Sequence, residues 1–428
     1  MQTYRIFLIL VFLIFGFGCT SPQTTFYVDH LMGNDVNPGT KSKPFKTIEK
    51  VNALSLRPGS SVLFACGQTF EGPLKFKGLA GTREQPILIG SFGKGRATIN
   101  GGTGNSIWAD SCSWLHVKNL KVIGDGRLKG NKGSGVEFRH VQNCTIDSLE
   151  ASGFLWSGVK ALGGKNLKIK SVYAHDNGFS GINVESDGQD AGGLEGSGGK
   201  TFRNVYIANS IAENNPGCPV VRNNHSGNGI LIGGVTNGMI EYCEAMNNGW
   251  DMPRDGNGPV GIWAYQSDSI TIQYCYSHHN KTSAKGKYGG GFDFDGGITN
   301  SVMQYNYSAH NEGAGYGIFQ YAGATTWSNN IVRFNTSFND GSKNGQCGIL
   351  MWCDPSAIPM KGLKAYENTI VNDQAFCVNL EPGNYPDFNF ENNCFILTVP
   401  SDRFIGGSFK GAIFDENFYW SKSDLHPK

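Results

Sequence analysis

The sequence is short of charge, of long apolar segments and of closely spaced cysteines. Charged residues make up 17% of its 428 residues, and 36 Lys and Arg nearly balance 35 Asp and Glu. Nucleic-acid backbones are bound by basic patches, so a net charge of +1 predicts that the chain has no nucleic-acid partner. No Cys-x-x-Cys pair with zinc spacing occurs, and no cofactor is expected. No long helical period runs through the body of the chain, which excludes a coiled coil.

Glycine and aromatic residues are what the sequence has in quantity. There are 60 Gly and only 16 Pro, and the glycine share is about twice the usual one. Aromatic residues at 12% and hydrophobic residues at 39% supply enough apolar surface for a large core. This composition predicts a turn-rich, all-β globular protein, and we expect it to be a monomer.

The first residues are typical of an export signal. An apolar run from Ile6 to Phe15 follows Arg5 and is too short to span a bilayer comfortably. The run leads to Gly16-Phe17-Gly18-Cys19, which resembles a bacterial lipoprotein signal, in which the Cys becomes the lipidated first residue. We therefore expect a signal peptide over 1–18, a lipid on Cys19, and an exported chain anchored to a bacterial membrane, at the outer membrane or cell surface. The lipid is expected to be its only contact with the membrane.

The body of the chain repeats. Short alternating strands recur at steps of 23 to 48 residues, within the range of solenoid proteins, and start at Val136, Val159, Ile182, Ile230, Ile262, Phe292, Ile318, Ile349 and Phe376. A second register of small polar residues precedes the turns, at Ser171, Asn209, Cys243, Cys275, Asn306, Asn335 and Asn368. Stacked coils of this kind predict a parallel β-helix with an internal asparagine ladder, in which the two cysteines are buried free thiols.

The opening of the mature chain resembles a known family. Tyr27-Val28-Asp29, Gly33-Asn34-Asp35, Asn37-Pro38-Gly39-Thr40 and Pro44-Phe45-Lys46-Thr47-Ile48 resemble the start of bacterial right-handed parallel β-helix proteins of the pectin-lyase-like superfamily. The resemblance implies one β-helix domain over 26–420, after a linker at 19–25 and before a tail at 421–428. Helical spacing of apolar residues adds a short amphipathic cap at 47–54. Members are mainly polysaccharide lyases, glycoside hydrolases, esterases and epimerases, so the resemblance implies a saccharide substrate.

A pair of carboxylates stands in Gly289-Gly290-Gly291-Phe292-Asp293-Phe294-Asp295-Gly296-Gly297. On a strand that begins at Phe292, both Asp side chains point outward, with Cα atoms roughly 6.6 Å apart. Inverting glycosidases separate their carboxyl groups by ~6.5–9.5 Å and retaining ones by ~5–5.5 Å, so the spacing leans toward inversion. Asp293 and Asp295 are the predicted acid and base. His310, directly after this repeat, and Asp255 are further catalytic candidates.

Aromatic residues flank the predicted pair on the neighbouring coils. Trp263 and Tyr265 precede it, Phe319 and Tyr321 follow it, and such a row suits the apolar faces of sugar rings. Arg254 could hold an acidic substituent of the substrate by a two-point contact. Glu185 faces outward on the strand two coils before Trp263. These six residues are the predicted substrate-binding set. His225 is expected to overhang the groove, whereas His175, His278 and His279 recur at one turn position and are typical of a structural ladder.

Three functions are consistent with these residues. The first is a glycoside hydrolase that uses the two Asp. The second is a calcium-dependent lyase acting on a uronate, with Asp293 and Asp295 as calcium ligands and Lys281, Lys285 or Lys287 as the base, because lyases of the superfamily commonly use Lys or Arg in this way. The third is a surface glycan-binding protein that uses the aromatic row without catalysis.

Overall fold

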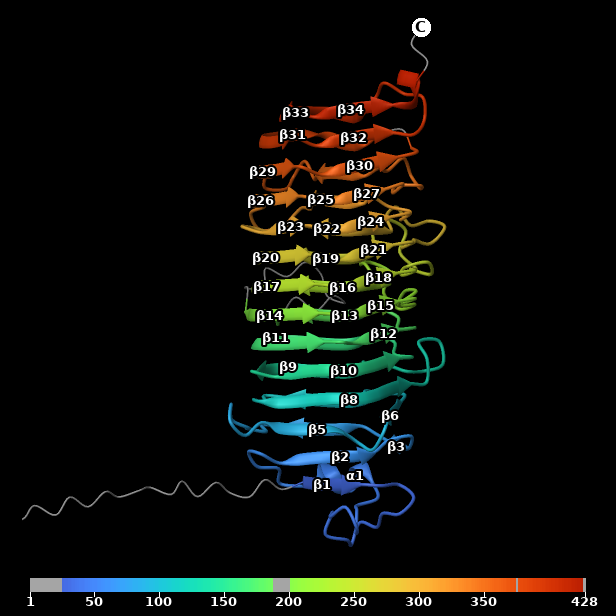
Figure 1. The fold of residues 1–428 in the computed structure, drawn as a ribbon, viewed down its shortest axis with the longest axis vertical. Coiled ribbons are helices and arrows are strands. Elements are labelled where there is room, and N and C mark those ends of the chain that lie inside the picture. The colour runs from blue at the N-terminus through green and yellow to red at the C-terminus, as the bar shows by residue number, and fades with distance from the viewer. Residues whose placement is uncertain (1–24, 188–200, 375, 426–428) are drawn as a thin grey trace, which may run out of the picture.

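Short apolar strands separated by turns wind into a column of stacked coils (Figure 1). The computed structural model describes residues 25–187, 201–374 and 376–425. Each coil contributes to three parallel sheets that run the length of the column, as the sequence predicts for a parallel β-helix. The expected signal peptide, Cys19 and most of the glycine-rich insertion at 187–200 lie outside the described residues.

The three sheets share five long strands that bend around the corners of the coil. The first sheet contains β1 (Thr25–Val28), β2 (Ser61–Ala65), β5 (Ile87–Phe92), β8 (Leu115–Gly124), β10 (Thr145–Ser152), β11 (Ser157–Lys170), β14 (Phe202–Ala208), β17 (Val235–Glu241), β20 (Asp268–Gln273), β23 (Val302–Gln304), β26 (Ser328–Arg333), β29 (Lys361–Tyr366), β31 (Val378–Glu391) and β33 (Ile405–Asp415). The second contains β3 (Thr69–Glu71), β6 (Ala97–Gly102), β8, β10, β12 (Tyr173–His175), β15 (Ile211–Glu213), β18 (Glu244–Met246), β21 (Tyr276–His278), β24 (Tyr307–Ala309), β27 (Thr336–Phe338), β30 (Thr369–Asn372), β32 (Cys394–Leu397) and β34 (Phe418–Ser421). The third contains β4 (Leu74–Lys77), β7 (Ile107–Asp110), β9 (Val136–Gln142), β11, β13 (Ser180–Glu185), β16 (Asn228–Gly233), β19 (Val260–Tyr265), β22 (Gly290–Phe294), β25 (Tyr316–Gln320), β28 (Ile349–Cys353), β31 and β33.

Inward-facing residues of the third sheet form one wall of the core. Ile182, Ile230, Ile262 and Phe292 are hydrogen-bonded neighbours in successive strands, and all four are fully buried. Burial of each such side chain stabilises the fold by about 1.5–3 kcal/mol. The sequence-derived register is therefore confirmed up to β22.

Beyond β22 the predicted register is wrong by two residues in β25 and in β31, whereas Ile349 in β28 was placed correctly. Phe292 lies opposite Tyr316 rather than Ile318, and Ile349 in turn lies opposite Tyr316 and Val378. Tyr316 belongs to the core because its buried hydroxyl donates to the carbonyls of Asn306 (3.0 Å) and Thr336 (2.9 Å). A hydrogen-bonded tyrosine fills an inward position that the sequence pattern had assigned to an aliphatic residue.

An asparagine ladder runs inside the column, as predicted, but with corrections. Asn306 Nδ2 donates to Asn335 Oδ1 (3.1 Å), and the same bond links Asn335 to Asn368 (3.0 Å). Below them Cys275 and Cys243 are buried free thiols. Ser171 and Asn209 are not part of the ladder, because strand pairing aligns Val172 and Ser210 with Cys243. A second ladder, absent from the sequence prediction, joins Asn177, Asn215, Asn248, Asn280, Asn311 and Asp340.

A short helix closes the N-terminal end. Helix α1 (Ile48–Asn52) begins after Thr47, whose hydroxyl accepts a hydrogen bond from the Lys50 amide at 3.2 Å. Ile48 and Val51 are buried against the first coil, which confirms the expected cap. At the other end, β33 and β34 form a last coil and a 3₁₀ helix, Lys422–Leu425, follows it. None of the helices in the described ranges is long and apolar enough to cross a membrane.

Candidate functional site

A cavity of about 630 Å³ lies on the outer face of the third sheet, in the middle of the column. Its floor is formed by strands β16, β19, β22, β25 and β28, and loops that precede these strands stand over it. The cavity is of the size that small-ligand sites usually have. It is lined by Phe179, Asn223, Asn224, His225, Leu231, Arg254, Asn257, Trp263, Tyr265, Lys287, Tyr288, Asp293, Asp295, Phe319, Tyr321, Ala322, Asn344, Gly345, Gln346, Leu350, Trp352, Asp354, Asn379 and Glu381.

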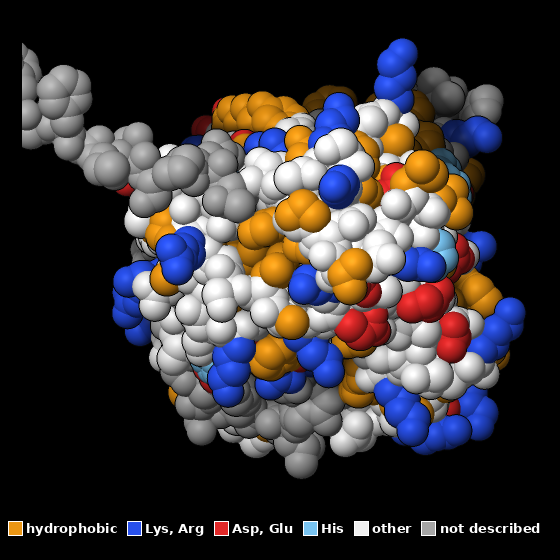
Figure 2. Space-filling model, turned by 90° about the horizontal axis from the view of Figure 1, so that it is seen from below, with side chains coloured by type: hydrophobic (Ala, Val, Ile, Leu, Met, Phe, Trp, Pro, Cys, Tyr) orange, Lys and Arg blue, Asp and Glu red, His pale blue; other side chains and the backbone are white. Residues whose placement is uncertain are grey.

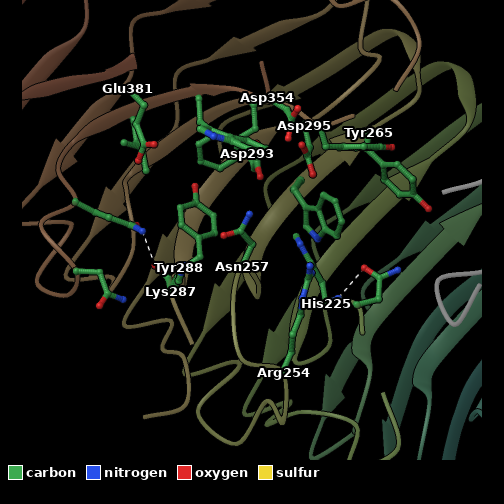
Figure 3. A pocket seen from close by; sticks show the side chains of 18 of the residues that line it. His225, Arg254, Asn257, Tyr265, Lys287, Tyr288, Asp293, Asp295, Asp354 and Glu381 are labelled. Carbon is green, nitrogen blue, oxygen red and sulfur yellow. Dashed lines mark hydrogen bonds between the residues drawn. The ribbon is translucent and has the colours of Figure 1, made fainter. Parts of the chain in front are cut away.

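The predicted carboxylate pair lies on the cavity floor (Figure 3). Neither oxygen of Asp293 has a hydrogen-bond partner among the described residues, and its side chain is fully buried. Burial, reinforced by the neighbouring Asp295 charge, raises the pKa of Asp293 well above its usual value. Asp295 Oδ1 accepts a hydrogen bond from the Gly296 amide at 2.7 Å. Burial raises its pKa to about 6, and the Gly296 hydrogen bond and Arg254 oppose the rise.

The two carboxyl groups thus differ in how readily they ionise. Burial without a partner favours the protonated form of Asp293, because an ionised carboxylate without a partner is costly to bury. Asp295 loses its proton above a pH of about 6. A protonated acid beside an ionised carboxylate is the combination that general acid–base chemistry requires.

Tyr288 is a cavity residue that the sequence analysis did not select. Its buried hydroxyl has no hydrogen-bond partner among the described residues. Burial and then the Asp293 charge raise the pKa of Tyr288 well above its usual value, so the phenol remains a hydrogen-bond donor. The strand pairing places Gly317 opposite Asp293, and a Cβ at Gly317 would lie 2.2 Å from the Tyr288 hydroxyl oxygen. Glycine at 317 therefore makes room for this hydroxyl near the acid. The tyrosine precedes a run of three glycines, a local signal that the sequence does contain.

The predicted aromatic row is present but is not an exposed platform. Trp263 is only 6% exposed, stacks on Tyr265 (5.3 Å between ring centroids) and packs at a tilt against His225 (5.3 Å). Its Nε1–H is buried and has no hydrogen-bond partner among the described residues. Phe319 and Tyr321 line the cavity too.

Glu185 lies beneath the cavity wall rather than in it. Its buried carboxylate accepts hydrogen bonds from the Tyr265 hydroxyl (2.5 Å) and from Asn183 Nδ2 (2.8 Å). The prediction that Glu185 binds substrate is therefore corrected: it orients Tyr265, which lines the cavity.

Basic residues line the side of the cavity that the loops form (Figure 3). Arg254 is there as predicted, and Lys287 lies beside Tyr288 in the chain. His225 overhangs the strands, as expected from the sequence. Burial, with a smaller effect of Arg254, lowers the pKa of His225 to about 3, so its imidazole is neutral at physiological pH. Asp354 and Glu381, which the sequence analysis did not select, add two acidic groups.

Two of the four predicted catalytic residues are not in the cavity. His310 is exposed at the turn after β24, where its ring packs against His279 (5.3 Å) and Phe338 (5.4 Å). Asp255 is exposed at a loop tip and pairs with Lys285 at 3.6 Å. His310 lies at a turn position where it packs against neighbouring turns and not on the third sheet. Asp255 is exposed to solvent.

A calcium site at the carboxylate pair finds little support. In the described ranges, no group of three or more His, Cys, Asp or Glu side chains is arranged to hold a metal ion. Calcium takes six to eight oxygen ligands, more than two Asp side chains can supply.

Comparison with known proteins agrees with this fold. Over 139 residues, 31% of this chain, the sequence is 33% identical to a lacto-N-biosidase of Bifidobacterium longum subsp. longum, of which the match covers 8%. A crystal structure of the GH136 lacto-N-biosidase from Eubacterium ramulus superposes with a TM-score of 0.64 and 18% identity, over 92% of this chain and 68% of that one. The model of the right-handed β-helix region matches residues 134–359, more than half of the chain, and the chain therefore belongs to this β-helix family.

Proposed function

We propose that the chain is a glycoside hydrolase in which Asp293 is the general acid and Asp295 the general base or nucleophile. The observation that carries the proposal is the buried pair itself, with one carboxyl group held neutral and the other ionised above a pH of about 6. In this mechanism Asp293 gives its proton to the leaving glycosidic oxygen. Asp295 then activates water in an inverting reaction or attacks the anomeric carbon in a retaining one.

The names of the partial relatives support a proposal for the substrate class. Both proteins in the comparison are called lacto-N-biosidases. We therefore propose an oligosaccharide substrate, and a lacto-N-biosidase substrate is the first to test. Trp263 Nε1 and the Tyr288 hydroxyl, donors without a partner among the described residues, suit sugar hydroxyl groups.

Replacement of each carboxyl group by its amide tests the proposal. Asp293→Asn and Asp295→Asn keep the volume and remove ionisation, and loss of one acid or base typically costs ~10²–10⁴ in rate. We expect both variants to fold and to lose turnover by that factor. Asp147→Asn, which removes a first-sheet carboxylate paired with Lys170 at 3.1 Å, is the matched control and should remain active. Full activity of both pair variants on a cleaved substrate would refute the assignment.

A lyase remains the second candidate because Lys287 and Tyr288 line the same cavity as the carboxyl pair. A β-elimination product carries an unsaturated uronate and absorbs in the ultraviolet, whereas a hydrolysis product does not. Product absorbance with a uronate-containing glycan would favour this candidate, and Lys287→Ala should then abolish it. Glycan binding without any cleavage would favour the surface glycan-binding protein.

A further inference from the structure

The most exposed large apolar side chains of the described chain lie on one loop at the N-terminal end. Val36 is 88% exposed, Met32 78% and Leu31 76%. The loop follows β1 and lies at the bottom of the column, at the same end as α1 (Figure 1). A view onto this end shows hydrophobic side chains with Lys and Arg around them and a group of Asp and Glu on one side (Figure 2). We call this loop, residues 30–36, the base loop.

Hydrogen bonds hold the base loop in its exposed position. Asp29 Oδ1 accepts from the amides of Leu31 (2.9 Å) and Met32 (2.9 Å). Asp35 accepts from the amides of Lys46 (2.8 Å) and Thr47 (3.0 Å). The apolar side chains are therefore displayed by a fixed backbone and do not fold back onto the core.

Exposed lysines lie beside the base loop, together with two half-buried carboxylates. Asp29 and Asp35 accept hydrogen bonds from backbone amides and their pKa values are lowered, so both remain ionised. Lys41, Lys43 and Lys46 are exposed on the segment that follows the loop. Apolar side chains beside lysines match a bilayer surface, where acyl chains lie below anionic headgroups.

The first strand of the column, which follows the expected lipidation site, also lies at this end. Strand β1 begins at Thr25, six residues after Cys19. Six residues span at most about 22 Å, so a lipid on Cys19 would hold this end of the column close to a membrane.

We propose that the base loop is a membrane-contact surface, in which Leu31, Met32 and Val36 enter the headgroup region of an anionic bacterial bilayer. The contact is separate from the lipid and holds the column with its base on the membrane. It is also independent of the proposed enzymatic function.

Tryptophan quenching by brominated lipid tests the proposal. The full chain with its own N-terminus is purified from membranes and placed in vesicles of phosphatidylethanolamine and phosphatidylglycerol with brominated acyl chains. Val36→Trp adds a reporter to the base loop, and Ile413→Trp adds a matched reporter at the opposite end, where Ile413 is 56% exposed. The eight native tryptophans give the same background in both variants.

We expect bromine to quench the added emission of Val36→Trp at least several-fold more than that of Ile413→Trp. Equal quenching of both reporters, or none at position 36, would overturn the proposal. Failure of the chain to bind the vesicles would overturn it as well. If the position 36 reporter is shielded from aqueous acrylamide without being quenched by bromine, a second protein copy covers the loop and the proposal is wrong.

Discussion

At the scale of the residue, Asp293 shows how burial prepares a group for chemistry. Its carboxyl group has no partner among the described residues and is fully buried, so the neutral form is favoured. Asp295, two residues further on, accepts a hydrogen bond from the Gly296 amide. This bond and the positive charge of Arg254 limit the rise of its pKa. Strand alternation predicted that both would face the same side. It could not predict their different pKa values, since these depend on loops that come from other coils.

The pKa difference predicts the pH dependence of activity. Asp295 must be ionised, so kcat/KM should fall as the pH drops below about 6. Asp293 must be protonated, so activity should also fall at alkaline pH, when this proton is lost. Because the pair is coupled, the limbs of the profile belong to the pair as a whole. A pH–rate profile on the cleaved substrate measures both limbs.

The pH–rate profile of the residual activity of Asp295→Asn is the control for this prediction. The substitution removes the neighbouring charge that helps to raise the pKa of Asp293. The alkaline limb should therefore move to lower pH, and the acid limb should disappear. An unchanged profile would mean that neither limb comes from this pair.

Trp263 predicts a specific effect on binding. Its Nε1–H has no partner among the described residues, and its ring stacks on Tyr265 and contacts His225. Trp263→Phe keeps an aromatic ring and removes the donor, so we expect KM to rise by roughly five- to tenfold with little change in kcat, as loss of one hydrogen bond of about 1 kcal/mol implies. Steady-state kinetics measures both constants. A fall in kcat with unchanged KM would show that the indole acts in the transition state instead.

At the scale of the element, the alternation of strands predicted most of the third sheet. Ile182, Ile230 and Ile262 are aliphatic and were placed correctly, whereas Tyr316 was missed because its polar hydroxyl is satisfied only by carbonyls of other segments. The second ladder was not predicted for the same reason, because its hydrogen bonds join residues from different coils. Asn280 bonds with Asn311 across 31 residues, and the sequence shows such a pair only once the coils are aligned.

The end of this second ladder predicts a pH effect on stability. Burial raises the pKa of Asp340 to about 6 from 3.8, although Ser337 and Asn311 donate to its carboxylate. A raised carboxyl pKa means that the folded state holds a proton more tightly than the unfolded state does. The corresponding stability is present below pH ~4 and is lost as the pH rises through about 6. The loss amounts to at most about 3 kcal/mol for a shift of about two units.

Asp340→Asn should remove this dependence. The amide keeps the shape, accepts from Asn311 through its oxygen and can donate to the Ser337 hydroxyl. Relative to the natural chain, the variant should gain thermal stability at pH 7 and show little difference at pH 4. Melting midpoints at the two pH values measure the change. Destabilisation at both pH values would show that the ionised carboxylate is needed by the ladder.

At the scale of the whole molecule, the column separates its base from its cavity. Seven strand pairings lead up the third sheet from β4 to β22. At about 4.8 Å for each pairing, the carboxyl pair stands roughly 34 Å above β4. The repeat of the sequence predicts this length, because each coil adds one strand spacing. The proposed anchor at one end and the proposed chemistry at mid-height can therefore be changed independently.

Cys19→Ala tests that independence. The substitution removes the acceptor of the expected lipid, so most of the chain should leave the membrane fraction. Its kcat/KM on a soluble oligosaccharide should stay within about twofold of the natural value, because the carboxyl pair is roughly 34 Å from the base. Fractionation followed by kinetics of the released protein measures both. Retention that also survives Leu31→Ser, Met32→Ser and Val36→Ser would require another anchor.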